Sequence, residues 1–353
     1  MNDATPQASE IWPEHDIEHL SSCPVCGGVE CEKMYGDLRD LVFFTAPGVW
    51  TLWRCNNCKS AYLNPRPTSA SIGRAYTNYF THEIDQKLTG QKISIATWFR
   101  HGVRNSYINY SFGHHLKPSF PGGWLAVVGK PSLCRRALHY IRHLPFPVDR
   151  KNQLLDIGSG NGEFLFVAQA LGYSAKGLES DPIAVKVTRE RGLDVVQGSI
   201  PRSVFPPMSF DQITLSHVVE HLHDPVSALY EIFELLKPGG RVWIQTPNID
   251  ANGRERFGAA WRGLEPPRHL VLFNFDCLSK ALSKIGFHSI KRLLPAPEVE
   301  FYFRRSVSVL EGKDPNCNSV RLSRTLRQDA RREEKLLASD PDLAESITVV
   351  AER

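Results

Sequence analysis

The chain has 353 residues, a hydrophobic fraction of 42% and a net charge of +4 at neutral pH. This size and composition allow one large or two medium globular domains. The mild charge gives no independent case for nucleic-acid binding, and the absence of an apolar run of 18 residues argues against a membrane span. Residues 1–20 are polar and lack the basic and apolar parts of a signal peptide, so we expect a disordered tail and a cytoplasmic protein.

The next segment carries two Cys-x-x-Cys pairs. Cys23 and Cys26 form the first, and Cys55 and Cys58 form the second after 28 intervening residues. In a reducing compartment, close pairs favour a metal over disulfides, and four thiolates suit a tetrahedral structural Zn²⁺. We therefore predict a zinc ribbon over residues 21–67, in which residues 50–54 form a strand that leads into the second pair. Redox-active dithiols or free thiols are the alternatives.

Residues 68–150 predict a helical linker or lid that is interrupted near residues 118–123, where prolines and glycines gather. Its second piece, residues 133–144, carries several basic side chains. A surface helix with one apolar face is the simpler interpretation, and peripheral contact with a membrane or an acidic partner is the alternative. We expect the ribbon and these helices to cover an acceptor pocket. Tyr76 and Tyr79 could touch a ligand, although core packing is the commoner role for such aromatics.

From residue 151 to 353, short apolar strands alternate with helices, which predicts a doubly wound α/β fold with a mostly parallel sheet. A charged segment, residues 305–344, is expected to be a helical insertion before the last strand. We expect strands at 154–157, 174–179, 194–197, 212–215, 241–246, 290–294 and 346–352, and helices at 164–171, 182–191, 227–236 and 277–285.

A glycine-rich turn follows the first of these strands. Asp156 ends the strand, and Gly158, Gly160 and Gly162 follow at alternate positions. Glycines permit positive φ and close approach of a ligand to the backbone. The spacing is not that of a pyrophosphate or phosphate loop, and an acidic residue at the strand end would repel phosphate. The turn instead suits a cationic ligand, and it resembles the first motif of the class I S-adenosylmethionine-dependent methyltransferases.

Further motifs in the right order strengthen this resemblance. Residues 220–225 read Glu-His-Leu-His-Asp-Pro after the fourth strand, and residues 237–240 read Lys-Pro-Gly-Gly before the fifth. The resemblance implies a seven-stranded Rossmann-like sheet, with the last strand antiparallel. It implies that Glu179 accepts hydrogen bonds from the ribose, while Ser199 replaces an acidic residue common in the family. The implied cofactor-binding residues are Asp156, Gly158, Ser159, Gly160, Gly162, Glu179, Ser180, Ser199, Ile200 and His217.

Methyl transfer is an in-line displacement, and a histidine suits the removal of a proton near neutral pH. The candidates are His269 first, His217 second, and His221. His269 ends a Pro-Pro-Arg-His segment that resembles a loop in bacterial methyltransferases encoded with glycan or natural-product pathways. A hydrogen bond that merely fixes the loop is the alternative role for His269.

The expected function is transfer of a methyl group from S-adenosylmethionine to oxygen, nitrogen or carbon of a small molecule or sugar. One alternative is an RNA or protein methyltransferase that uses the ribbon to hold its substrate. An alternative of another class is a non-catalytic S-adenosylmethionine-binding module. The intact glycine turn and Glu179 argue against a non-catalytic module.

Overall fold

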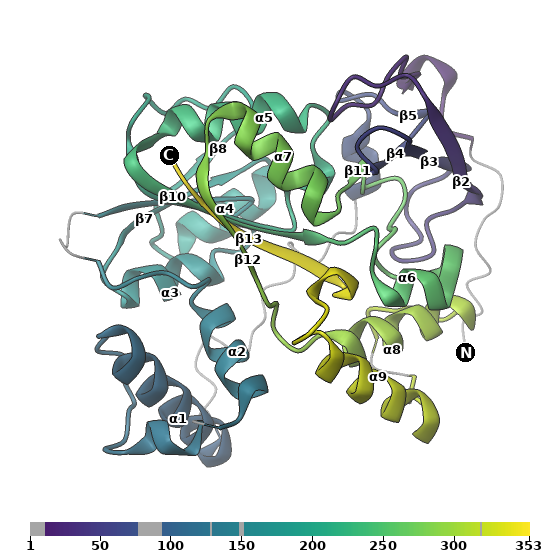
Figure 1. The fold of residues 1–353 in the computed structure, drawn as a ribbon. Helices are drawn as coiled ribbons and strands as arrows, with labels where there is room; N and C mark the ends of the chain where they lie inside the picture. The colour runs from purple at the N-terminus through teal and green to yellow at the C-terminus, as the bar shows by residue number, and fades with distance from the viewer. Residues whose placement is uncertain (1–10, 77–93, 128, 148–151, 318–319) are drawn as a thin grey trace.

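The computed structural model describes residues 11–76, 94–127, 129–147, 152–317 and 320–353. Within these residues, seven strands form a central sheet in the order β12-β13-β10-β9-β6-β7-β8 (Figure 1). Its strands are β6 (Gln153–Ile157), β7 (Ser174–Glu179), β8 (Val195–Gln197), β9 (Phe210–Ser216), β10 (Leu236–Pro247), β12 (His288–Leu293) and β13 (Ser346–Glu352).

The central sheet is parallel except at its last strand. β6 pairs in parallel with β7 and β9, and β9 pairs in parallel with β10. β13 lies antiparallel between β10 and β12, as the sequence predicts for the final strand. The doubly wound, mostly parallel fold is therefore confirmed, and the carboxyl ends of β6, β7 and β9 meet at one edge of the sheet.

The helices of this α/β unit begin where the sequence places capping residues. Asp181 accepts a hydrogen bond from the Ile183 amide before α4, and Asp224 accepts one from the Ser227 amide before α5. A proline follows each aspartate, and its fixed φ suits the first helical turn. These helices are α3 (Glu163–Ala170), α4 (Pro182–Glu190), α5 (Pro225–Leu235) and α7 (Phe275–Ile285).

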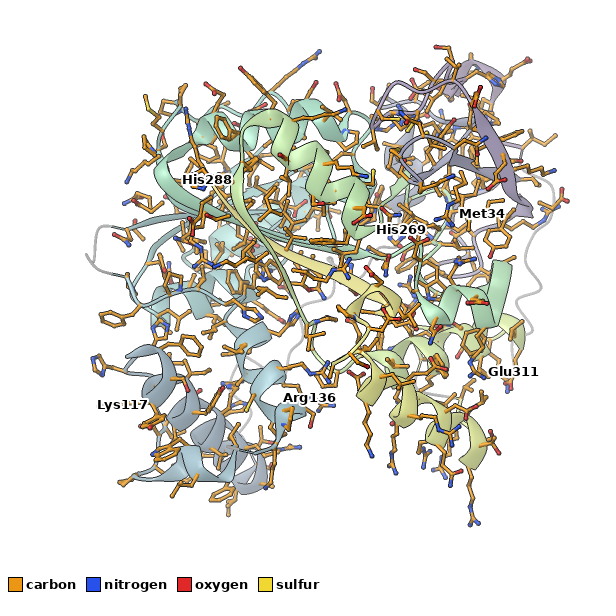
Figure 2. All side chains as sticks on the ribbon, in the orientation of Figure 1. Met34, Lys117, Arg136, His269, His288 and Glu311 are labelled. Atoms are coloured by element: carbon orange, nitrogen blue, oxygen red, sulfur yellow. The ribbon has the colours of Figure 1, made fainter. Side chains whose placement is uncertain are left out.

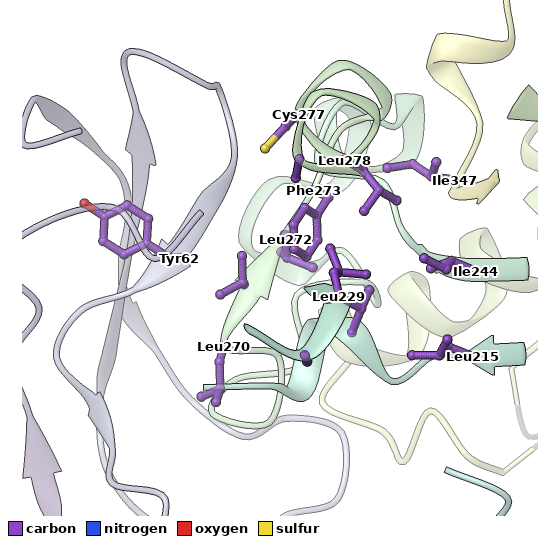
Figure 3. Close-up of a cluster of buried hydrophobic side chains, with 14 of the residues drawn as sticks. Tyr62, Leu215, Leu229, Ile244, Leu270, Leu272, Phe273, Cys277, Leu278 and Ile347 are labelled. Carbon is purple, nitrogen blue, oxygen red and sulfur yellow. The ribbon is translucent and has the colours of Figure 1, made fainter. Parts of the chain in front are cut away.

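The N-terminal strands form a second sheet with one strand from the α/β unit. The order is β11-β4-β3-β2, and β11 pairs antiparallel with β4. Figure 3 shows the shared core, in which Leu272 and Phe273 lie between Tyr62 of this sheet and Ile244 of the central sheet. The ribbon is therefore continuous with the α/β unit. The bounds are β2 (Cys31–Leu38), β3 (Trp50–Cys55), β4 (Ala61–Leu63) and β11 (Val271–Leu272).

The expectation of a disordered tail over residues 1–20 is wrong for residues 11–20, and residues 1–10 lie outside the described part. Trp12 is 1% exposed and packs edge-on against Trp50. Its indole N–H donates to Ser71 Oγ at 3.3 Å. A buried indole with a hydrogen-bonded nitrogen anchors this segment. Nearby lie η1 (Glu14–Asp16), η2 (Ile72–Tyr76) and the paired strands β1 (Ile17–Glu18) and β5 (Arg66–Pro67).

The linker is helical where it is described. α1 (Ile95–Phe112) ends at Gly113 with φ of 72°, and η5 (Gly123–Ala126) and α2 (Pro131–Tyr140) follow. In Figure 1, α1 and α2 lie below α3, on the opposite side of the molecule from the N-terminal sheet. Tyr79 lies outside the described residues.

Two helices, α8 (Val299–Leu310) and α9 (Arg324–Leu336), precede the last strand and pack on a small core of their own around Phe303 and Ala330. They fall within the segment where the sequence predicts a helical insertion, although α8 begins earlier than expected. α6 (Asn252–Phe257), η7 (Gly258–Ala260) and η8 (Pro341–Leu343) lie around them. None of the helices that the structure describes is both long and apolar enough to span a membrane.

Candidate functional site

The glycine turn after β6 needs glycine for two reasons. Gly158, Gly160 and Gly162 all have φ between 52° and 80°, where a side chain strains the backbone. A Cβ on Gly158 would also lie 2.5 Å from the Val218 side chain. The turn therefore packs directly against the segment that follows β9. The glycine motif and the motif at residues 220–225 thus lie close together.

Glu179 connects this turn to the end of β7. One carboxylate oxygen accepts the Gly160 amide at 2.8 Å, and the other accepts the Asp181 amide at 2.9 Å. The side chain is 8% exposed. The carboxylate is thus held rigidly beside the glycine turn, at the position where the family motif has the ribose ligand, with lone pairs left to accept further hydrogen bonds.

Asp156 has a protein partner that the sequence does not reveal. It is 1% exposed, and its Oδ1 accepts hydrogen bonds from Arg142 and, at 2.8 Å, from Thr214 Oγ1. Burial raises the pKa of Asp156, and Arg142 opposes that shift. A cation from the protein therefore already neutralises this carboxylate. Asp156 Oδ2 is buried without a hydrogen-bond partner.

The other expected cofactor contacts differ in exposure. Ser180 and Ser199 are exposed, whereas Ile200 is 4% exposed and belongs to the main core. Ser159 is buried, and its Oγ has no hydrogen-bond partner. Ser159 and Asp156 thus each present an unsatisfied polar atom at the glycine turn, which fits a site that binds a polar ligand.

His217 and Glu220 form a hydrogen-bonded pair directly after β9. His217 Nδ1 lies 3.2 Å from Glu220 Oε1, and its side chain is 41% exposed. Burial alone would lower the pKa of His217, but the bond to Glu220 outweighs it and raises the pKa above the ordinary 6.5. Burial alone would raise the pKa of Glu220, but His217 and its neighbours hold it at about 2. The carboxylate orients the imidazole and leaves Nε2 available to accept a proton.

His221 and His269 stand beside this pair, with ring centroids 4.8 Å apart. His269, labelled in Figure 2, lies between the N-terminal sheet and the central sheet. Its Nδ1 lies 2.7 Å from the Gly263 carbonyl, and burial lowers its pKa to about 4. His221 Nδ1 lies 3.0 Å from the Tyr76 hydroxyl. Burial therefore weakens His269 as a base and the Gly263 carbonyl occupies its Nδ1, whereas the bond to Glu220 raises the pKa of His217.

The neighbouring Arg268 is a residue whose role sequence reasoning missed. It is fully buried, its guanidinium binds Asp40 and the Ala75 carbonyl, and its Nε donates to Glu265 Oε1 at 3.1 Å. Asp40 lies 228 residues earlier in the chain, so no local pattern could link the two. Arg268 thereby joins the Pro-Pro-Arg-His loop to the N-terminal segment.

The four cysteines converge. Their sulfur atoms all lie within 4.8 Å of one another; Cys23 Sγ and Cys58 Sγ are 3.6 Å apart, and Cys26 Sγ and Cys55 Sγ are 3.5 Å apart. Zinc–thiolate bonds of about 2.3 Å in a tetrahedron separate the sulfurs by about 3.8 Å. The Gly28 amide also points at Cys26 Sγ, as suits a thiolate. The donor set and spacing fit a structural Zn²⁺.

The comparisons with known proteins agree with this geometry. A family model described as "Methyltransferase domain" matches residues 131–291. The chain is 31% identical over 183 residues to the ubiquinone biosynthesis O-methyltransferase of Xanthomonas campestris pv. campestris strain B100, covering 48% of this chain and 70% of that protein. The chain belongs to the S-adenosylmethionine-dependent methyltransferases and is an enzyme of that family.

Two further proteins are similar to parts of this chain. The mitochondrial ubiquinone biosynthesis O-methyltransferase of Schizosaccharomyces pombe is 30% identical over 103 residues, and the match spans 27% of this chain and 37% of that protein. A crystal structure of an S-adenosylmethionine-dependent methyltransferase from Archaeoglobus fulgidus aligns with 21% identity and a TM-score of 0.43, covering 64% of this chain and 95% of that one.

Proposed function

We propose that this methyltransferase moves the methyl group to a hydroxyl oxygen of a small molecule, with His217 as the general base. The observation that carries this proposal is the pair of His217 and Glu220 at the carboxyl end of β9, beside the glycine turn. A hydroxyl must lose a proton as it attacks, and an imidazole held by a carboxylate can take that proton. The similar proteins named above are O-methyltransferases of ubiquinone biosynthesis, which supports a small hydroxylated acceptor.

The chain's own residues supply binding and orientation. S-adenosylmethionine, when bound, supplies an electrophilic methyl group. We propose that Glu179 holds its ribose, and that Asp156 Oδ2, Ser159 Oγ, Ser180, Ser199, Ile200 and the backbone of Gly158, Gly160 and Gly162 line the rest of its site. Glu220 keeps the His217 ring fixed, so that Nε2 meets the acceptor hydroxyl in one orientation. We further propose that Cys23, Cys26, Cys55 and Cys58 hold a structural Zn²⁺.

The test is a transfer assay with radiolabelled S-adenosylmethionine against catechol, methyl glucoside, a primary amine, total RNA and bulk protein. We expect label in one of the hydroxyl compounds. Replacement of His217 by Gln should remove that transfer and leave the affinity for S-adenosylhomocysteine, measured by calorimetry, within twofold. Label confined to RNA, protein or the amine would contradict the proposal, and so would a His217→Gln enzyme with wild-type turnover.

A further inference from the structure

One line of side chains across the central sheet is polar. Ser216 of β9, Gln245 of β10 and Thr348 of β13 are partners in the strand register, and together they form what we call the polar row. Gln245 is 3% exposed and Thr348 is fully buried. Strands that helices cover on both faces are normally apolar throughout, so the polar row departs from what packing requires.

The neighbouring line of residues shows what packing alone selects. Leu215, Ile244 and Val349 pair in the same way one residue away, and they point to the opposite face because side chains alternate along a strand. All three are fully buried in the main apolar core, and Figure 3 shows two of them, Leu215 and Ile244. The polar row is therefore a property of one face of the sheet and not of these strands as a whole.

Several polar atoms on this face are buried and unsatisfied. Thr348 Oγ1 and the indole nitrogen of Trp243, two residues before Gln245, have no hydrogen-bond partner in the described part of the chain. His139 of α2 lies over Trp243, with ring centroids 5.6 Å apart, and interacts with the Gln245 side chain, while its Nδ1 is also unsatisfied. Such atoms are rare because they have lost their hydrogen bonds to water. Three of them around one row indicate that a ligand supplies the missing partners.

Helices enclose the polar row. Figure 1 shows α2 and the pair of α8 and α9 on the same side of the central sheet. Arg135 of α2 donates to the Pro295 carbonyl at 3.3 Å and pairs with Glu334 of α9 at 2.7 Å. The hydroxyl of Tyr302 on α8 lies 3.4 Å from Ser346 Oγ, at the start of β13. These contacts join the helices over the sheet, so the polar row lies inside the protein.

The polar row begins at the proposed base. His217 lies between β9 and η6 (Val219–His221), directly after Ser216, and its amide donates to the Gln245 carbonyl at 2.8 Å. From there the row crosses β10 and β13, whereas the glycine turn and Glu179 lie at β6 and β7, on the other side of β9. With strands about 4.8 Å apart, the row is about 10 Å long. It therefore extends from the proposed base away from the proposed cofactor site.

We propose that the polar row and Trp243 bind the acceptor, and that the acceptor is a neutral molecule with several hydroxyl groups. This inference rests on the proposed function, because it concerns the substrate of the same site. The row and Trp243 offer hydroxyls, an amide and an indole N–H, all of them uncharged. Burial lowers the pKa of His139 to about 4, so its ring is neutral at pH 7 as well. A polyol can satisfy these groups with hydrogen bonds, whereas an acceptor without enough hydroxyls would leave them unpaired.

The charged groups around the polar row disfavour an anionic acceptor. The nearby cations are already paired with carboxylates: Arg142 with Asp156, Arg135 with Glu334, and Arg262 with Glu265. Glu298 lies near Ser346 and His217, and burial raises the pKa of its carboxyl to about 7. A phosphate or carboxylate on the acceptor would therefore meet a further acid instead of an unpaired cation, whereas a neutral hydroxyl can hydrogen-bond to Glu298 in either protonation state.

The experiment measures acceptor binding to the full chain by saturation-transfer NMR at pH 7, with saturating S-adenosylhomocysteine. The probes are methyl glucoside, myo-inositol, glucosamine, glucose 6-phosphate and catechol. We expect methyl glucoside or myo-inositol to bind at least tenfold more tightly than the last three. Thr348→Val keeps the side-chain shape and removes the hydroxyl, so it should weaken this binding at least tenfold. It should leave the melting temperature unchanged or raise it, because it removes an unsatisfied buried group.

Ser308→Ala is the matched control. Ser308 is also buried, but its hydroxyl donates to the Arg304 carbonyl at 3.1 Å within α8, so its loss should leave probe binding unchanged. Thr348→Ser keeps the hydroxyl and should retain most of the affinity that Thr348→Val loses. Trp243→Phe, which removes only the indole N–H and part of the ring, should weaken probe binding as Thr348→Val does.

Four results would overturn the proposal: binding of neither polyol, equal probe affinity in Thr348→Val and Ser308→Ala, a clear fall in the melting temperature of Thr348→Val, or tightest binding of a charged probe or catechol. If catechol is methylated on oxygen while neither polyol binds, the proposed function stands and the polar row has no role in acceptor binding. If a polyol binds through Thr348 but label enters only the amine, RNA or protein, the proposed function fails while the polyol site stands.

Discussion

Replacement of Arg268 by Met should destabilise the whole protein more than its position in a loop suggests. The guanidinium is fully buried and lies between the carboxylates of Asp40 and Glu265. Removing one partner of a buried ion pair costs about 3 to 5 kcal/mol, because the remaining charge is left without compensation. With an unfolding entropy of about 2.1 cal/mol/K per residue, this 353-residue chain should melt about 4 to 7 °C lower.

Thermal unfolding followed by circular dichroism at pH 7 measures the effect. Arg304→Met is the control, since Arg304 is 36% exposed and pairs with Glu300 on the surface of α8, where such pairs contribute little. Adding Asp40→Asn to Arg268→Met should recover part of the loss, because it removes the Asp40 charge, whereas Glu265 keeps its ion pair with Arg262. A melting temperature for Arg268→Met equal to that of the control would refute the reasoning.

Four further outcomes follow from the site. Glu179→Gln should weaken S-adenosylhomocysteine binding about 10- to 100-fold by calorimetry, from the loss of charge-assisted hydrogen bonds, while exposed Glu163→Gln should not. Because neutral His217 is the proposed base and its pKa is raised above 6.5, turnover should rise with pH through a value above 6.5; a flat profile from pH 6 to 9 would count against this role. Cys58→Ser should abolish stoichiometric zinc in metal analysis and lower the melting temperature. Burial raises the pKa of Glu345 from 4.5 to about 8, so its contribution to stability is complete below pH 4.5 and is lost as pH rises through 8. Unfolding free energy should fall over that range by up to about 1.4 kcal/mol per pH unit, and Glu345→Gln should flatten the slope.

Local signals were enough to predict most of the fold. The Asp-Pro steps at residues 181–182 and 224–225 mark helix starts, and alternating apolar segments mark strands, because caps and periodicity act over a few residues. The expected strand bounds for β7 and β13 agree with the structure. The cysteine cluster was also predictable, since short Cys-x-x-Cys spacing leaves few other geometries.

Contacts between distant residues were not predictable. Nothing near Asp156 in the sequence indicates that Arg142 would bind its carboxylate, and nothing near Arg268 indicates Asp40. Nothing near His269 in the sequence indicates that it is buried, because its burial comes from packing between the two sheets and not from its neighbours in the chain. The partner of a buried charged residue depends on the tertiary structure. A single sequence therefore shows which charged residues are present but not which of them form pairs.

The pairing of β4 with β11 limits how this protein can be divided. Residues 131–291, which the family model matches, contain β11 but not its partner strand. An excised fragment would leave an open strand edge and expose the apolar side chains of Val271 and Leu272, now fully buried. Open edges of this kind recruit other chains and promote aggregation. The smallest well-behaved fragment of this enzyme should therefore retain the N-terminal sheet.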